Sequence, residues 1–305
     1  MHITLMNKNM NLGIQLLRMI LCFWVISFHS LQKNKVNYSI LNIIKTKLYH
    51  VPCFVFISFY YTFNVFFNKN IKKFQNRLER LLIPYILWPL LILLIDFITN
   101  KRAFNYHILI VQLLLGTQFM IPHWYLFSLI FLSILFFIIS YLFNNKFLSI
   151  LHYLAILSYI VQYSGYYRFL NNYKNNVRYP LLHTLGIFPI SIIGLTFASL
   201  KGIDFFLKNQ KKGLFLSSIL IYFLFKYNIF IEIIGYNGIS HIFASLSFFV
   251  FFYLFPLNNI NYIIKLIIVK ITNYTNGIYC LQSKMIGIVN NKFNLHGNFR
   301  SVIII

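Results

Sequence analysis

Two polar residues interrupt the first long apolar run of the sequence, and both can act on a ligand. Arg18 and His29 lie eleven positions apart in LGIQLLRMILCFWVISFHSL (12–31). Eleven residues make close to three helical turns, so both side chains share a helix face and lie roughly 16 Å apart. Arginine binds anions, and histidine transfers protons near neutral pH. Together they can hold the two ends of one extended ligand, such as a pantetheine arm with phosphates at one end and a thioester at the other.

Each of these two residues also has a purely structural interpretation. An arginine inside a membrane span is costly unless it is paired, faces a wet cavity or extends to the headgroups. Arg18 lies only one to two turns into the run and can extend its guanidinium to the lipid headgroups. His29 lies near the other end of the run and can simply be interfacial. The sequence leaves both interpretations open.

A second basic feature precedes the third apolar run. Arg77 and Arg80 are three residues apart in RLERLLIPYILW (77–88), a spacing that predicts two guanidinium groups on one helix face. Such a pair suits a phosphate, because a guanidinium can donate two parallel hydrogen bonds to its oxygens. The competing interpretation is an ordinary basic flank of a membrane helix, in which Glu79 balances its neighbours.

The remaining candidates carry weaker signals. His123, beside Trp124, opens a later apolar run and can line the same cavity as the residues above. No glycine-rich phosphate loop, Cys/His metal spacing or nucleophile elbow is present, so no metal site is predicted. The other polar residues considered are Asp96, Asp204 and Glu232, each able to orient a histidine or pair an arginine, and His50, His152, His183 and His241, for which a structural role is the simpler interpretation.

Composition excludes a water-soluble domain. Of the 305 residues, 59% are apolar or aromatic and only 10% are charged, against about 25% charged residues in soluble domains. The net charge of +23 comes from 27 Lys+Arg against 4 Asp+Glu. These basic residues lie in short stretches between apolar runs, so anionic lipid headgroups, rather than nucleic acid, are the predicted partner.

The elements that must position these side chains are membrane helices. Apolar runs recur at about the 20-residue length that a bilayer needs, and they predict an all-α, polytopic transmembrane helix bundle of about nine spans in a single domain, 1–305. The segment 107–116 is too short to span. Loop charges do not decide the orientation. The predicted spans are 12–31, 50–67, 81–98, 123–143, 147–167, 181–200, 213–230, 238–256 and 262–283.

Five motifs follow one another along the chain, namely RMILCFWVISFH (18–29), HVPCFVFISFYY (50–61), RLERLLIPYILW (77–88), HWYLF (123–127) and NYTNGIYCLQ (273–282). In this order they resemble the acyltransferase 3 family of membrane O-acyltransferases. Two departures accompany the resemblance: Phe59 follows Ser58 where the family has Ser-Gly, and Gln282 replaces the family's late histidine. The family has one more span where this chain stops at VIII (302–305), so a final C-terminal span is expected to be missing.

The resemblance implies a multi-pass enzyme of the bacterial cytoplasmic membrane. Its donor would be a cytoplasmic acyl-CoA, acetyl-CoA in the simplest case, and its acceptor a hydroxyl of a polysaccharide, lipid-linked sugar or similar glycan. His29 and Arg18 would be catalytic, and Arg77, Arg80 and Arg18 would bind the coenzyme. Two alternatives remain: a glycan or lipid transporter or flippase, and an inactive, truncated relative. The sequence does not predict the oligomeric state.

Overall fold

The computed structural model describes residues 11–31, 49–100, 123–163, 178–226, 239–257 and 260–273. Every regular element within these ranges is a helix, which confirms the all-α prediction for this part of the chain. In chain order the elements are α1 (Leu12–Leu31), α3 (His50–Phe67), α4 (Ile71–Asn100), α6 (His123–Phe143), the 3-10 helix η1 (Asn144–Lys146), α7 (Phe147–Tyr163), α9 (Arg178–Ser199), α10 (Gly202–Leu207), α11 (Gln210–Lys226), α12 (Ile239–Leu254) and α13 (Tyr262–Asn273).

Apolar runs and helices coincide closely where a run is bounded by polar turns. Helices α1, α3 and α6 have the predicted bounds, whereas α4 begins at Ile71 and not at residue 81. Asn70 explains the early start, because its side-chain oxygen accepts a hydrogen bond from the Lys73 amide at 2.9 Å, as an N-cap residue does. The predicted segment 107–116 lies outside the described residues, as does the motif 273–282 beyond its first residue, Asn273, which ends α13.

Two of the described helical stretches have the length and hydropathy of membrane spans. One is His50–Phe67, with a mean hydropathy of 1.3, and the other is the 38-residue stretch Trp124–Val161, with a mean hydropathy of 2.6. Shorter apolar helices cover Leu12–Phe28, His183–Ser199 and Ser240–Leu254. A polytopic bundle fits this pattern, while the count of about nine spans stays a prediction.

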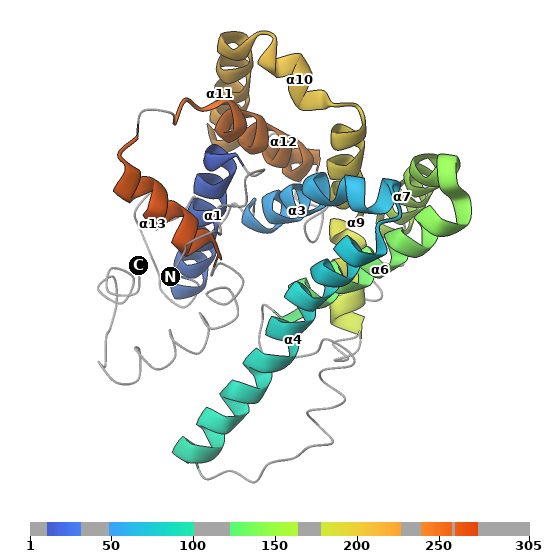
Figure 1. Cartoon of the computed structure of the whole chain (residues 1–305), viewed down its shortest axis with the longest axis vertical. Coiled ribbons are helices and arrows are strands. Elements are labelled where there is room, and N and C mark those ends of the chain that lie inside the picture. The colour runs from blue at the N-terminus through green and yellow to red at the C-terminus, as the bar shows by residue number, and fades with distance from the viewer. Residues whose placement is uncertain are drawn as a thin grey trace.

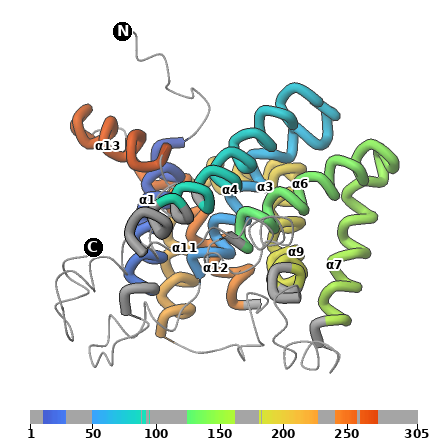
Figure 2. Tube along the Cα trace, turned by 90° about the horizontal axis from the view of Figure 1, so that it is seen from below, coloured from blue at the N-terminus to red at the C-terminus, as the bar shows by residue number. Residues whose placement is uncertain are grey.

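Helix α3 lies at the centre of the arrangement and packs against α1, α6, α9 and α12 (Figure 1). Helix α4 leaves the end of α3 and crosses α6 before it extends away from the bundle (Figure 1). In the view from below, α7 lies at the outer edge beyond α9, and α13 lies beside α1 (Figure 2). Residues of α3 and α6 are therefore well placed to meet the first turns of α4.

The closest backbone approach that concerns the site is between α3 and α9. Gly194 of α9 faces the Phe56 carbonyl of α3, and a Cβ added at Gly194 would lie 2.8 Å from that oxygen. Glycine is needed here because a larger residue would push the two backbones apart. This contact fixes α3 at a point two residues before Ser58.

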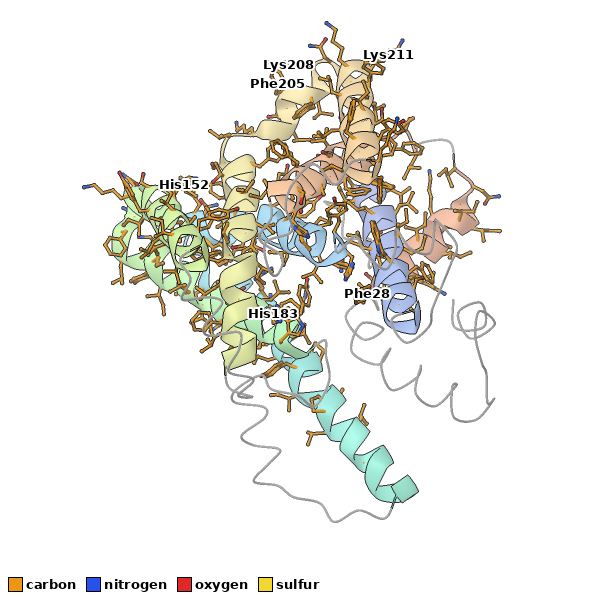
Figure 3. The ribbon with its side chains drawn as sticks, turned by 180° about the vertical axis from the view of Figure 1, so that it is seen from behind. Phe28, His152, His183, Phe205, Lys208 and Lys211 are labelled. Carbon is orange, nitrogen blue, oxygen red and sulfur yellow. The ribbon has the colours of Figure 1, made fainter. Side chains whose placement is uncertain are left out.

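Ring contacts relate the direction of α6 to that of α3, whereas α9 crosses α3 steeply (Figure 1). The pairs Phe54–Tyr125 and Phe66–Phe136 match the start and end of α3 to those of α6. Two contacts join α6 to α9, namely Ser128–Thr184 and Phe136–Phe188. Two more join the start and middle of α3 to α12, namely Tyr49–His241 and Phe56–Phe249. Lys208 and Lys211, which follow α9 in sequence, are exposed beside α10 and α11 (Figure 3).

Candidate functional site

Arg77 joins three helices through its guanidinium group. Its Nε donates a hydrogen bond to Ser133 Oγ of α6 at 3.0 Å, and its Nη2 donates one to Ser58 Oγ of α3 at 3.0 Å. The guanidinium carbon lies 5.2 Å from the centroid of the Phe59 ring, within the range of a cation–π interaction. Arg77 as a whole residue is half-buried, and its guanidinium lies among these groups of α3 and α6.

The sequence of α4 explains why Arg77 points inward. Phe74, one turn earlier, is buried and stacks on Phe137 of α6, with ring centroids 4.0 Å apart and planes inclined by 4°. Residues three apart on a helix lie on neighbouring positions of one face. The stacked rings therefore set the rotation of α4 that brings Arg77 against α3 and α6.

Arg18 approaches the same region from α1. Its electrostatic neighbours include Tyr125 of α6 and Tyr61 of α3. Tyr125 is in turn an electrostatic neighbour of both Arg18 and Arg77, and only 5% of its surface is exposed. Two guanidinium groups from different helices thus share the neighbourhood of one buried phenol.

The other predicted site residues are placed differently. Arg80 is exposed on α4, as is Glu79 beside it. His29 belongs to the helical backbone of α1, but its side chain lies outside the described residues, as do those of His123 and Asp96. The structure therefore brings Arg18 and Arg77 to one region, leaves Arg80 at the surface, and leaves the predicted shared anion site of Arg77 and Arg80 a prediction.

Comparison with known protein families places the chain in one of them. Residues 11–305 match the model of the acyltransferase 3 family, described as an acyltransferase domain. The chain belongs to the acyltransferase 3 family. This membership supports a membrane acyltransferase, in agreement with the apolar helices described above. No curated protein and no solved structure matches the chain.

Four further histidines of this acyltransferase 3 member lie within the described residues, and each packs against or hydrogen-bonds to a neighbouring helix. On α7, His152 shares a 2.8 Å hydrogen bond with Thr196 of α9. Near the start of α9, His183 lies against Trp124, with ring centroids 4.5 Å apart. Figure 3 shows these two histidines on separate parts of the molecule. Two further histidines are buried among aromatic rings, namely His50 and His241.

No metal centre is visible in the part of the chain that the structure describes. Within it, no three His, Cys, Asp or Glu side chains lie close enough together to hold a metal ion. The groups that can act on a ligand here are guanidinium groups, hydroxyls and a phenol. This set of donors suits oxyanions rather than cations.

Three residues of the family member's candidate site were missed by sequence reasoning. Ser133 lies in the apolar run of α6. Tyr125 lies in the HWYLF motif, in which the sequence indicated a role only for His123. Ser58 was noted only as the start of a departure from the family pattern. A weak signal did exist, because hydroxyls inside strongly apolar runs need partners, but it does not say which helix supplies them.

Proposed function

We propose that this chain transfers an acyl group, acetyl in the simplest case, from cytoplasmic acyl-CoA to a hydroxyl of a polysaccharide or lipid-linked sugar. The observation that carries the proposal is that Arg18 and Arg77, from two different helices, are both electrostatic neighbours of Tyr125 within an apolar bundle. The described partners of Arg77 are neutral. A half-buried cation with neutral partners favours an anionic ligand, and the phosphates of coenzyme A are such anions.

The three arginines divide the work of donor binding. Arg80, exposed at the start of α4, attracts the phosphates from solution. Arg77 holds a phosphate within the bundle, and Arg18 lies further along the path of the pantetheine arm. A bacterial cytoplasmic membrane supplies the surrounding bilayer, which fits the exposed apolar side chains of α4, α6 and α7, such as Ile83, Ile138 and Ile160.

The chemical step requires a base at the thioester end of the donor. The acceptor hydroxyl oxygen attacks the thioester carbonyl carbon while His29 takes the hydroxyl proton. The carbon–sulfur bond then breaks, the ester remains on the acceptor, and the sulfur leaves with the proton from His29 as free coenzyme A. General-base help of this kind contributes roughly 10²–10⁴ in rate. The roughly 16 Å between Arg18 and His29 leaves room for an extended donor arm.

The test is acetyl-CoA turnover by the purified chain in liposomes. Release of coenzyme A and formation of an acetyl ester are measured with a panel of glycan acceptors. We expect turnover in the wild type and in the exposed-lysine control Lys146→Ala, and loss of turnover in Arg18→Ala and His29→Ala. Full activity of folded His29→Ala would exclude its role as base. Acceptor transport without release of coenzyme A would instead support the transporter alternative.

A further inference from the structure

We infer that Ser58 and Ser133 are positioning residues that present one edge of Arg77 to a phosphate group. The identity of the ligand, the phosphates of acyl-CoA, rests on the proposed function. The positioning itself follows from the two hydrogen bonds that Arg77 donates to these serines.

The two serines occupy a single edge of the guanidinium group. A guanidinium has five N–H donors in a fixed planar fork. Ser133 accepts from Nε and Ser58 accepts from Nη2, and these two nitrogens lie side by side along one edge. The described contacts leave the other edge, formed by Nη1 and Nη2, to a ligand. That edge donates two parallel hydrogen bonds, the geometry that a phosphate accepts.

The helix backbone fixes the direction in which Ser133 can act. Its hydroxyl donates to the carbonyl of Leu129 in α6 at 2.6 Å. A serine hydroxyl has one proton, so Ser133 can only accept from Arg77. Ser133 is fully buried, which removes water as a competing donor. The serine is therefore a fixed acceptor that holds the Nε side of the guanidinium.

The Phe59 ring completes the restraint on Arg77. This fully buried ring covers one face of the guanidinium at 5.2 Å. The two hydrogen bonds define the edge, and the ring restricts rotation of the guanidinium plane. An arginine held in this way loses little freedom when a ligand binds, because its ordering occurred on folding. Loss of either serine is expected to weaken phosphate binding without touching the reacting atoms.

The first experiment compares donors with and without phosphates. For Ser133→Ala and Ser58→Ala we expect KM for acetyl-CoA to rise roughly tenfold, with little change in kcat, the size of one hydrogen bond to a charged group. KM for acetyl-pantetheine, which has no phosphate, is expected to stay at the wild-type value. Acetyl-dephospho-CoA, which lacks only the 3′-phosphate, identifies which phosphate Arg77 holds.

Two further variants separate positioning from general damage. Ser140→Ala, also on α6, removes a buried hydroxyl that donates to the Phe137 carbonyl, and it is expected to behave as wild type. Ser58→Thr keeps the hydroxyl at a half-buried position and is expected to restore most of the acetyl-CoA affinity. An equal rise in KM for acetyl-CoA and acetyl-pantetheine, or no rise in either, would overturn the inference.

A direct binding measurement distinguishes this inference from the proposed function. If the wild type neither binds nor turns over acetyl-CoA, the proposed function fails. The serine variants are then compared in binding inorganic pyrophosphate and vesicles that contain phosphatidic acid. Weaker binding of one probe in both serine variants, and not in Ser140→Ala, supports the positioning role and identifies the phosphate source. Unchanged binding of both probes would contradict it.

Discussion

Arg77 and Arg80 lie three residues apart on α4, yet their environments are opposite. The face of α4 that packs into the bundle follows the positions 74, 77, 81 and 85, of which Phe74, Leu81 and Tyr85 are buried. Arg77 belongs to this stripe and reaches α3 and α6, whereas Arg80 falls beside the stripe and is exposed.

The difference shows that two residues three apart on one helix can have different exposures, while a joint anion site of Arg77 and Arg80 stays a prediction. Two residues three apart differ by roughly 60° around a helix axis. When the boundary between protein and solvent falls within that angle, one side chain becomes an interior group and the other a surface group. An interior cation interacts strongly with a ligand, while salt and water screen a surface cation. We therefore expect the two arginines to differ in the size and kind of their effects.

Removing the arginines one at a time gives the largest expected contrast. Arg77→Ala is expected to lower kcat/KM for acetyl-CoA roughly 100-fold, because two hydrogen bonds to a charged ligand are lost. Arg80→Ala is expected to stay within about threefold of wild type at physiological salt. Steady-state kinetics in liposomes measures both. Equal losses in the two variants would mean that they form one joint site after all.

Replacing Arg77 by lysine tests shape separately from charge. Lysine keeps the positive charge but has no planar fork, so it cannot bind both serines and two phosphate oxygens together. We expect Arg77→Lys to raise KM for acetyl-CoA roughly tenfold, and Arg80→Lys to have no measurable effect. A fully active Arg77→Lys would show that charge alone suffices and that the edge geometry is dispensable.

Substitution of a distant glycine tests whether the interior arginine depends on the position of α3. The Cβ of Gly194→Ala would lie 2.8 Å from the Phe56 carbonyl oxygen, a backbone atom, so α3 must shift together with Ser58. We expect a stability loss of about 1–3 kcal/mol and a KM for acetyl-CoA raised roughly threefold. Thermal unfolding and kinetics measure the two effects. The control is Gly213→Ala on α11, where the close neighbour is the flexible Leu254 side chain.

The smallest expected effect concerns Arg80 and salt. If Arg80 attracts the donor from solution, Arg80→Ala is expected to lower kcat/KM about twofold to threefold at low ionic strength. The difference is expected to vanish near 0.5 M salt, where the screening length falls to roughly 4 Å. The defect of Arg77→Ala is expected to persist under both conditions. A salt-independent defect in Arg80→Ala would place its side chain in contact with the bound donor.

The sequence predicted helices best where apolarity alone determines their ends. The bounds of α1, α3 and α6 coincide with apolar runs, because a helix within a bilayer continues for as long as the chain remains apolar. Helix α4 begins earlier, at Ile71, because its first turns are amphipathic and their buried stripe starts with Phe74. A hydropathy argument detects the apolar part of such a helix and omits its polar beginning.

The charged residues of the candidate site were predictable from the sequence, but the serines that hydrogen-bond to Arg77 were not. Arg18 and Arg77 were identified because charges are rare in this chain and arginine has distinctive chemistry. Ser58 and Ser133 were missed because their importance depends on how α3, α4 and α6 are rotated against one another. That rotation is set by contacts such as the Phe74–Phe137 stack, which join residues far apart in the chain.

The hydrogen bonds of Arg77 also limit how this site can evolve. Positions 58, 77 and 133 lie on three helices, yet both serines act through Arg77, and Arg77 is held in place best when both serines are present. Replacement of Arg77 would leave two serines with no charged partner and no reason to remain hydroxyl residues. Loss of either serine first would weaken an arginine that the chain still needs. We therefore expect substitutions at these three positions to be correlated in evolution, and we expect Arg77 to be replaced before either serine.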